Sequence, residues 1–140
     1  MMNETNPPRR LGRSLLALVA GMLAGIVLSI GTDVLMHAVG LFPALGQPIS
    51  SAPLVLATGY RSVYGVVSSY IAARLAPSQP MTHALVLGVV GFVVSIIGAV
   101  VTWNKGAAFG PHWYPVALIV LAIPTAWLGG KLFLMQSARR

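Results

Sequence analysis

The chain has few charged residues and no cysteine. Only 8% of its 140 residues are charged, and two of them are acidic, whereas soluble domains carry roughly 25% charged residues. A water-soluble fold of this size could not cover so much apolar surface. The lack of cysteine excludes disulfides, thiolate metal ligands and a cysteine nucleophile. The composition therefore favours a protein whose main partner is the lipid bilayer.

The net charge of +7 could suggest a nucleic-acid partner. Nucleic-acid binding requires a concentrated basic face on a folded soluble module. In this chain the basic residues lie at the ends of apolar runs, so we exclude nucleic acid as a partner.

Four apolar runs cover most of the chain, at about 14–40, 54–74, 83–103 and 112–132. A hydrocarbon core about 30 Å thick needs about 20 helical residues. Strands of a membrane barrel would alternate in polarity, and these runs do not. We therefore predict an all-α integral membrane four-helix bundle with up-down topology. Residues 14–135 form its single domain, and 1–13 and 136–140 form polar tails.

Basic residues predict the orientation. In a four-helix bundle, one side of the membrane has only Lys105. The other side has seven basic residues: Arg9, Arg10, Arg13, Arg74, Lys131, Arg139 and Arg140. Because basic residues are retained on the cytoplasmic side, we expect both termini to be cytoplasmic. An alternative interpretation of residues 9–24 is a cleaved signal peptide, although the apolar run is long for one.

Rows of small residues predict how the helices pack. Small side chains at intervals of three or four residues let helix backbones approach closely in lipid. The predicted packing positions are Gly21, Gly25, Ser29, Gly65, Ser69, Gly88, Gly91, Ser95 and Gly98.

The first two apolar runs form a predicted antiparallel hairpin whose loop is centred on Gln47. Residues at equal depth then have numbers that sum to about 94, which pairs Gly25 with Ser69 and Ser29 with Gly65. The same register pairs Asp33 with Arg61. Neither charge is easily tolerated alone inside a membrane, so we expect a buried ion pair in the outer half of the bundle.

Unusual polar residues gather near this pair and form a candidate polar site. Its members are Asp33, His37, Tyr60, Arg61, Tyr64 and His112. One interpretation is structural, with the ion pair holding the helices in register. The other is functional, because ionisable residues inside a membrane commonly mark a site.

The sequence leaves three functional classes open. A transporter or channel for a small cation, proton or small solute would use Asp33 and His37, and a bundle this thin would form a homodimer. A haem or metal site would need Asp33, His37 and His112 together. An enzyme would need a nucleophile with a base, or several carboxylates, which the chain lacks. We therefore expect no enzymatic activity, no cofactor and no metal.

Three stretches carry a resemblance: 59–65 leading to 72–77, then 83–88, then 112–115 leading to 126–130. Together they resemble small bacterial inner-membrane proteins with four predicted helices and no assigned activity. The resemblance implies a bacterial inner (cytoplasmic) membrane and adds no mechanism. We expect a structural or accessory protein, with a homodimer or another membrane protein as partner; the alternative is an oligomeric transporter or channel.

Overall fold

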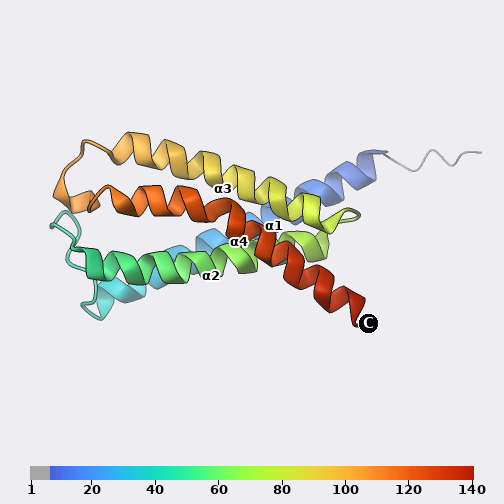
Figure 1. Ribbon diagram of the computed structural model, residues 1–140, viewed down its shortest axis with the longest axis horizontal. Coiled ribbons are helices and arrows are strands. Elements are labelled where there is room, and N and C mark those ends of the chain that lie inside the picture. The colour runs from blue at the N-terminus through green and yellow to red at the C-terminus, as the bar shows by residue number, and fades with distance from the viewer. Residues whose placement is uncertain (1–6) are drawn as a thin grey trace, which may run out of the picture.

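The computed structural model describes residues 7–140 (Figure 1). This part of the chain is all-helical, as the sequence predicts, and contains no strand. The helices are α1 (Pro7–Ala38), α2 (Ser51–Leu75), α3 (Pro80–Thr102) and α4 (Trp113–Ala138), and a single 3-10 turn, η1 (Ala107–Phe109), lies between α3 and α4.

α1 begins before its predicted apolar run, and α4 ends after its run. α1 begins at Pro7, so it includes residues 7–13, which the sequence assigns to a polar tail. Proline is suited to a first helical turn, where its missing N–H is not needed. α4 continues to Ala138, past the predicted end at 132. In both cases the helix extends through polar residues, because helix formation does not require an apolar side chain. Residues 1–6 of the predicted tail lie outside the described part.

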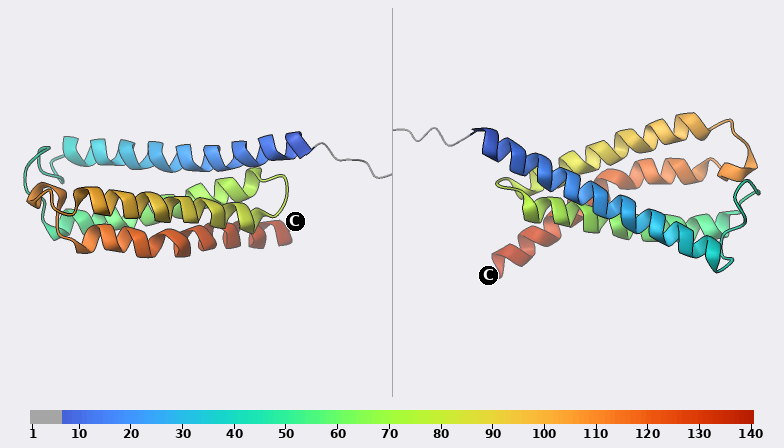
Figure 2. Two further views of the ribbon diagram at one scale, coloured as in Figure 1. Left: turned by 90° about the horizontal axis from the view of Figure 1, so that it is seen from above. Right: turned by 180° about the vertical axis from the view of Figure 1, so that it is seen from behind.

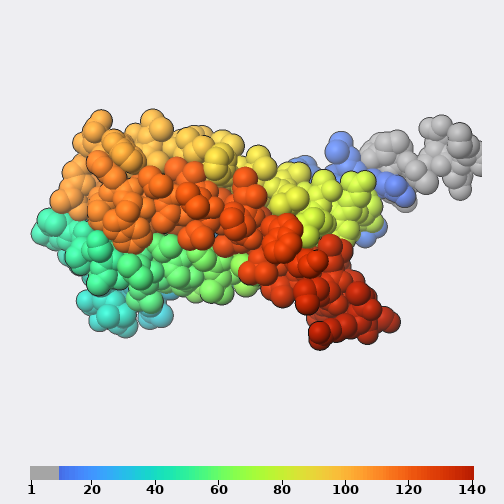
Figure 3. All heavy atoms as spheres, in the orientation of Figure 1, coloured from blue at the N-terminus to red at the C-terminus, as the bar shows by residue number. Residues whose placement is uncertain are grey.

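The helices run up and down, with the α1–α2 and α3–α4 connections at one end (Figure 1). α2 and α3 diverge from the short connection that joins them at the other end. α4 lies between them on one face, and its atoms fill that space (Figure 3). α1 crosses the opposite face obliquely as a separate layer (Figure 2). The C-terminal turns of α4 project from the body.

The interior consists of small side chains. Apart from Phe42, Leu54 and Leu87, the buried apolar residues are all alanines. Large apolar side chains instead cover the outside; for example, Val27 and Val100 are 66% and 73% exposed. In a soluble bundle the large apolar side chains would lie inside. This protein is therefore packed by close backbone approach and presents its hydrophobic surface outward.

Three described segments are long and apolar enough to cross a membrane: Arg10–Ala38, Pro80–Thr102 and Ala107–Ala138. The more polar α2 is not among them, although the sequence predicts that it crosses. The position of α2 inside the bundle explains why it is more polar than the other helices. From Arg61 to Ala73, only Val63 is exposed, because the other helices surround α2.

Hydrogen bonds join the α1–α2 connection and the start of α2 to the α3–α4 connection and the start of α4. Ile49 N donates a hydrogen bond to Ala107 O (3.1 Å), and Trp113 Nε1 donates to Ser51 Oγ (3.1 Å). Gly110 has a φ of +80°, and a Cβ there would lie 2.5 Å from Leu54 Cδ1. The backbone conformation therefore favours glycine at this position, and a Cβ would also force Leu54 to move aside.

Candidate functional site

A charged cluster joins α1 to α2. The Nη2 of Arg61 donates to Oδ2 of Asp33, forming an ion pair, and the Tyr60 hydroxyl donates to Oδ1. Tyr60 and Arg61 are consecutive in α2, so their side chains reach the carboxylate from adjacent positions. The register of the hairpin therefore brings the one acid of α1 together with the one base in the middle of α2.

The pair is less buried than the sequence analysis predicts. The side chains of Arg61 and Asp33 are 34% and 27% exposed. In addition, the Nε of Arg61 is buried without a hydrogen-bond partner among the described residues. The exposure has a geometric cause: the cluster lies at the edge of a groove that the four helices leave open.

Two tyrosines and a threonine surround the cluster. The Tyr64 hydroxyl, one turn after Tyr60, shares a hydrogen bond of 2.7 Å with Thr32 Oγ1. Tyr114, in the first turn of α4, is half-buried and close enough to interact electrostatically with Arg61 and Asp33. Tyr114 is not among the six residues of the predicted candidate site. It lies in the first turn of α4, and no spacing in the sequence relates it to Asp33 or Arg61.

The two candidate histidines are not part of the cluster. His37 Nδ1 bonds the backbone carbonyl of Asp33 (2.8 Å), and its ring packs edge-on against Phe42. His112 Nε2 bonds the carbonyl of Trp103 (2.8 Å), and the two rings stack with centroids 4.0 Å apart. His112 thus lies at the end of α3, and the set of Asp33, His37 and His112 is not assembled around one point.

A groove of about 430 Å³ begins at the charged cluster. Asp33 and Arg61 line one end of it, and Met22 and Leu87 line the other. Along α1 it extends from Met22 to Asp33, eleven helical steps apart, which corresponds to about 16 Å at 1.5 Å per residue. All four helices contribute to its lining, which is more apolar than polar.

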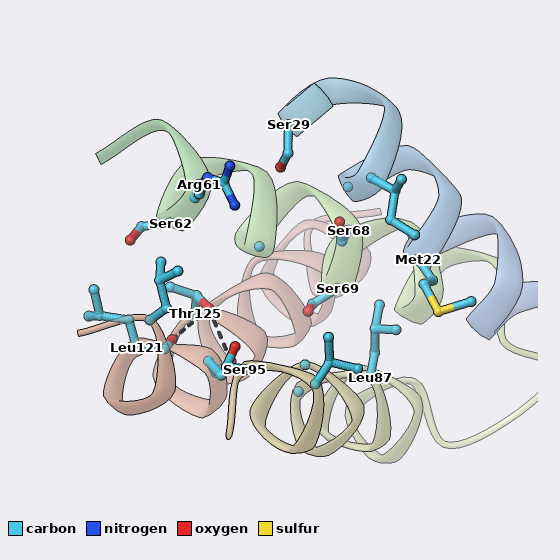
Figure 4. A pocket seen from close by; sticks show the side chains of 18 of the residues that line it. Met22, Ser29, Arg61, Ser62, Ser68, Ser69, Leu87, Ser95, Leu121 and Thr125 are labelled. Atoms are coloured by element: carbon cyan, nitrogen blue, oxygen red, sulfur yellow. Dashed lines mark hydrogen bonds between the residues drawn. The ribbon is translucent and has the colours of Figure 1, made fainter. Parts of the chain in front are cut away.

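Hydroxyl groups from several helices face this groove. Figure 4 shows Ser29 of α1, Ser69 of α2 and Ser95 of α3 with their hydroxyls directed toward the shared space. Thr125 of α4 also lines it, but its hydroxyl donates to the carbonyl of Leu121 (2.7 Å) in its own helix. The groove therefore combines apolar walls with a few polar groups, the usual composition of a small-molecule site.

The α1–α2 contact is displaced by one residue from the predicted register. A Cβ at Gly25 would overlap Ser68 Oγ, and a Cβ at Gly21 would lie 2.6 Å from Ser68 O. Ser68 therefore faces α1 where Ser69 was predicted. Adjacent helix positions differ in direction by about 100°, so Ser69 turns toward α4 instead, where it meets Gly129.

Gly65 likewise packs against α4, because a Cβ there would lie 2.9 Å from Thr125 Oγ1. Along α3, Gly88 is in close contact with Ala126 of α4. Gly91 and Gly98, which the sequence predicts as packing positions, have no neighbour within 4 Å of a Cβ. Gly91 lines the groove and Gly98 is exposed.

Comparisons with family models, with curated proteins and with solved structures find no match to this chain. In residues 7–140, no three side chains of the His, Cys, Asp or Glu type are grouped as a metal ion would require.

Proposed function

We propose that the protein is an integral inner-membrane protein of four spanning helices with a structural or accessory role, in which Asp33 and Arg61 fix the position of α1 on α2. The reversed distribution of side chains supports the membrane placement: small residues inside and large apolar residues outside suit lipid as solvent. The basic ends of the helices favour cytoplasmic termini in a bacterial cell.

The ion pair with Tyr60 is the observation that carries the structural role. Both carboxylate oxygens of Asp33 accept hydrogen bonds from α2. A carboxylate held in this way is already neutralised, so it is poorly suited to bind and release a cation. It is well suited to hold α1, which contacts the rest of the bundle mainly through α2.

Exchange of the two charges tests this role. Asp33→Asn should lower the free energy of unfolding in detergent by about 1–3 kcal/mol, because the guanidinium loses its partner. The double variant Asp33→Arg with Arg61→Asp should regain part of the loss. A double variant no more stable than Asp33→Asn would contradict a pairing role.

Transport of a small cation or proton is the second candidate, and the groove is the observation that favours it. The groove reaches both Asp33 and Arg61 and carries hydroxyls from several helices. Conduction would require this groove to become continuous with water on both sides of the membrane, and the interior of the bundle is tightly packed around Ala72 and Ala73, which are 0% and 1% exposed.

Liposomes containing the purified protein separate the two candidates. Flux of H⁺, Na⁺, K⁺ and tetramethylammonium is measured with wild type, with Asp33→Asn and with empty liposomes. The accessory role predicts rates equal to those of empty liposomes for every ion. A flux that wild type supports and Asp33→Asn abolishes would favour transport.

A further inference from the structure

We infer that the groove binds the chain of a neutral, single-chain lipid whose hydroxyl or carbonyl group lies against Asp33 and Arg61. This inference rests on the proposed membrane placement and goes beyond the structural role of the ion pair. It is carried by the volume of the groove, by its charge and by the partial exposure of Arg61.

The charged residues of the groove lie at one end of it, and its other polar groups are uncharged hydroxyls. Its polar end, at Asp33 and Arg61, is the end nearer to the α1–α2 and α3–α4 connections. Toward the other end the walls are mainly apolar, with Met22 and Ile26 of α1 and Val90 of α3, and carry no charge although Ser68 and Ser69 of α2 also line them. A lipid of the outer leaflet has the same order, with its polar group near the interface and its chain toward the bilayer centre.

Arg61 requires a polar neighbour in this environment. Arg61 lines the groove, and about a third of its side chain is exposed, whereas its Nε is buried. Against hydrocarbon alone, the exposed N–H groups of the guanidinium would be left without an acceptor, which is costly in a membrane. A polar atom at the head of the groove would meet this need.

The charge of the site selects a neutral group. Arg61 and Asp33 cancel each other, so an anionic headgroup would be attracted by the guanidinium and repelled by the carboxylate. A hydroxyl can accept from Arg61 and donate to Asp33, and a carbonyl can accept from Arg61. Carboxylate, phosphate and ammonium groups gain no net attraction from this pair.

The volume limits the occupant to a slender molecule. The space of about 430 Å³ lies within the usual range of small-molecule sites, about 300–1,000 Å³. Its length of about 16 Å along α1 fits part of one extended chain, and a diacyl lipid would bring two chains to the same volume.

Two glycines of α3 provide a matched pair of variants. Neither Gly91 nor Gly98 has an atom within 4 Å of an added Cβ, so both should accept a larger residue without unfolding. Gly91 lines the groove, whereas Gly98 does not. Gly91→Leu should therefore fill the groove, and Gly98→Leu is its control.

The binding of tritiated oleyl alcohol to the purified protein in detergent tests the inference. Wild type and Gly98→Leu should bind one molecule per chain with affinities that agree within about twofold, and Gly91→Leu should bind at least about tenfold more weakly, a difference of about 1.4 kcal/mol. Oleate and oleylamine, which share the chain and differ in headgroup charge, should compete less well than unlabelled oleyl alcohol. In the Asp33→Asn variant, oleate should compete better than unlabelled oleyl alcohol, because Arg61 then carries the only charge of the site.

Three results would overturn the inference. They are equal binding by Gly91→Leu and Gly98→Leu, no saturable binding by wild type, and competition that is indifferent to headgroup charge. A wild-type dimer that Gly91→Leu alone converts to monomer would assign the groove to a second copy of the chain instead. None of these results depends on the charge-exchange experiment, so the structural role of the pair can hold or fail separately.

Discussion

Tyr60 donates a hydrogen bond to the carboxylate oxygen of Asp33 that Arg61 does not occupy. The acid of α1 is thus held by two successive residues of α2. A helix pair held by a single ion pair could rotate about that contact, whereas two donors on the same carboxylate restrict the rotation. The cluster therefore fixes both the depth and the direction of α1.

Tyr60→Phe should destabilise the protein more than Tyr64→Phe. A hydrogen bond to a charged group contributes about 1.5–3 kcal/mol, and one between neutral groups about 0.5–1.5 kcal/mol. Tyr64 bonds the neutral hydroxyl of Thr32 and serves as the matched control. The measurement is the free energy of unfolding in detergent micelles; equal losses for the two variants would count against a special role of Tyr60.

Gly129→Ala should destabilise the contact between α4 and α2. An added Cβ would overlap the carbonyl of Val66 and lie 2.8 Å from Ser69 Cβ. Because backbone atoms cannot move aside cheaply, we expect a cost of about 1–3 kcal/mol, typical of overpacking. Thermal unfolding of the purified protein measures it.

Gly91→Ala is the control for that variant. Its Cβ meets open space, and alanine favours a helix over glycine by up to about 1 kcal/mol. We expect stability equal to or above that of wild type. A Gly129→Ala variant as stable as Gly91→Ala would show that the close approach of α4 to α2 is absent.

The sequence predicted the fold and the central pair because both depend on features that span many residues. The lengths of the four apolar runs predict four helices. The loop centred on Gln47 predicts which depths match, and that prediction brings Asp33 near Arg61. An error of one residue in register hardly changes which charges can meet, because the side chain of arginine is long.

The same error of one residue changes which small residues pack together. Gly25 meets Ser68, and the neighbouring Ser69 faces α4. Rows of small residues indicate that a helix face allows close approach, but they do not specify the partner. Gly98 has the same spacing as Gly88 and Gly91 and remains exposed.

The groove could not be predicted from the sequence. The groove exists because α2 and α3 diverge while α1 crosses obliquely (Figures 1 and 2). Those angles depend on the contacts of all four helices together. The residues of the groove are distributed over four segments, and no spacing within one segment indicates them.

His112→Ala should loosen the end of α3. The ring of His112 stacks on Trp103 and bonds its carbonyl. A stacked aromatic pair contributes about 0.5–1.5 kcal/mol, so we expect a loss in that range and a weaker near-UV circular dichroism signal. His83→Ala is the control, because His83 bonds only the carbonyl of Gln79 at the start of its own helix. Similar near-UV spectra for both variants would contradict the stacked geometry.

The central claim is that all four helices, including the polar α2, cross the membrane. Because the chain has no cysteine, single cysteines can be introduced without a background. Suitable exposed positions are Gln47, Ser78, Lys105 and Ser137, one in each connection and one near the end of α4. A membrane-impermeant maleimide then reports the side of each position in intact bacterial cells.

We expect Gln47→Cys and Lys105→Cys to react in intact cells, and Ser78→Cys and Ser137→Cys to react only after the membrane is permeabilised. The comparison of Gln47 with Ser78 is decisive, since these two positions flank α2. Labelling of both from the same side would show that α2 does not cross, and would contradict the four-span account.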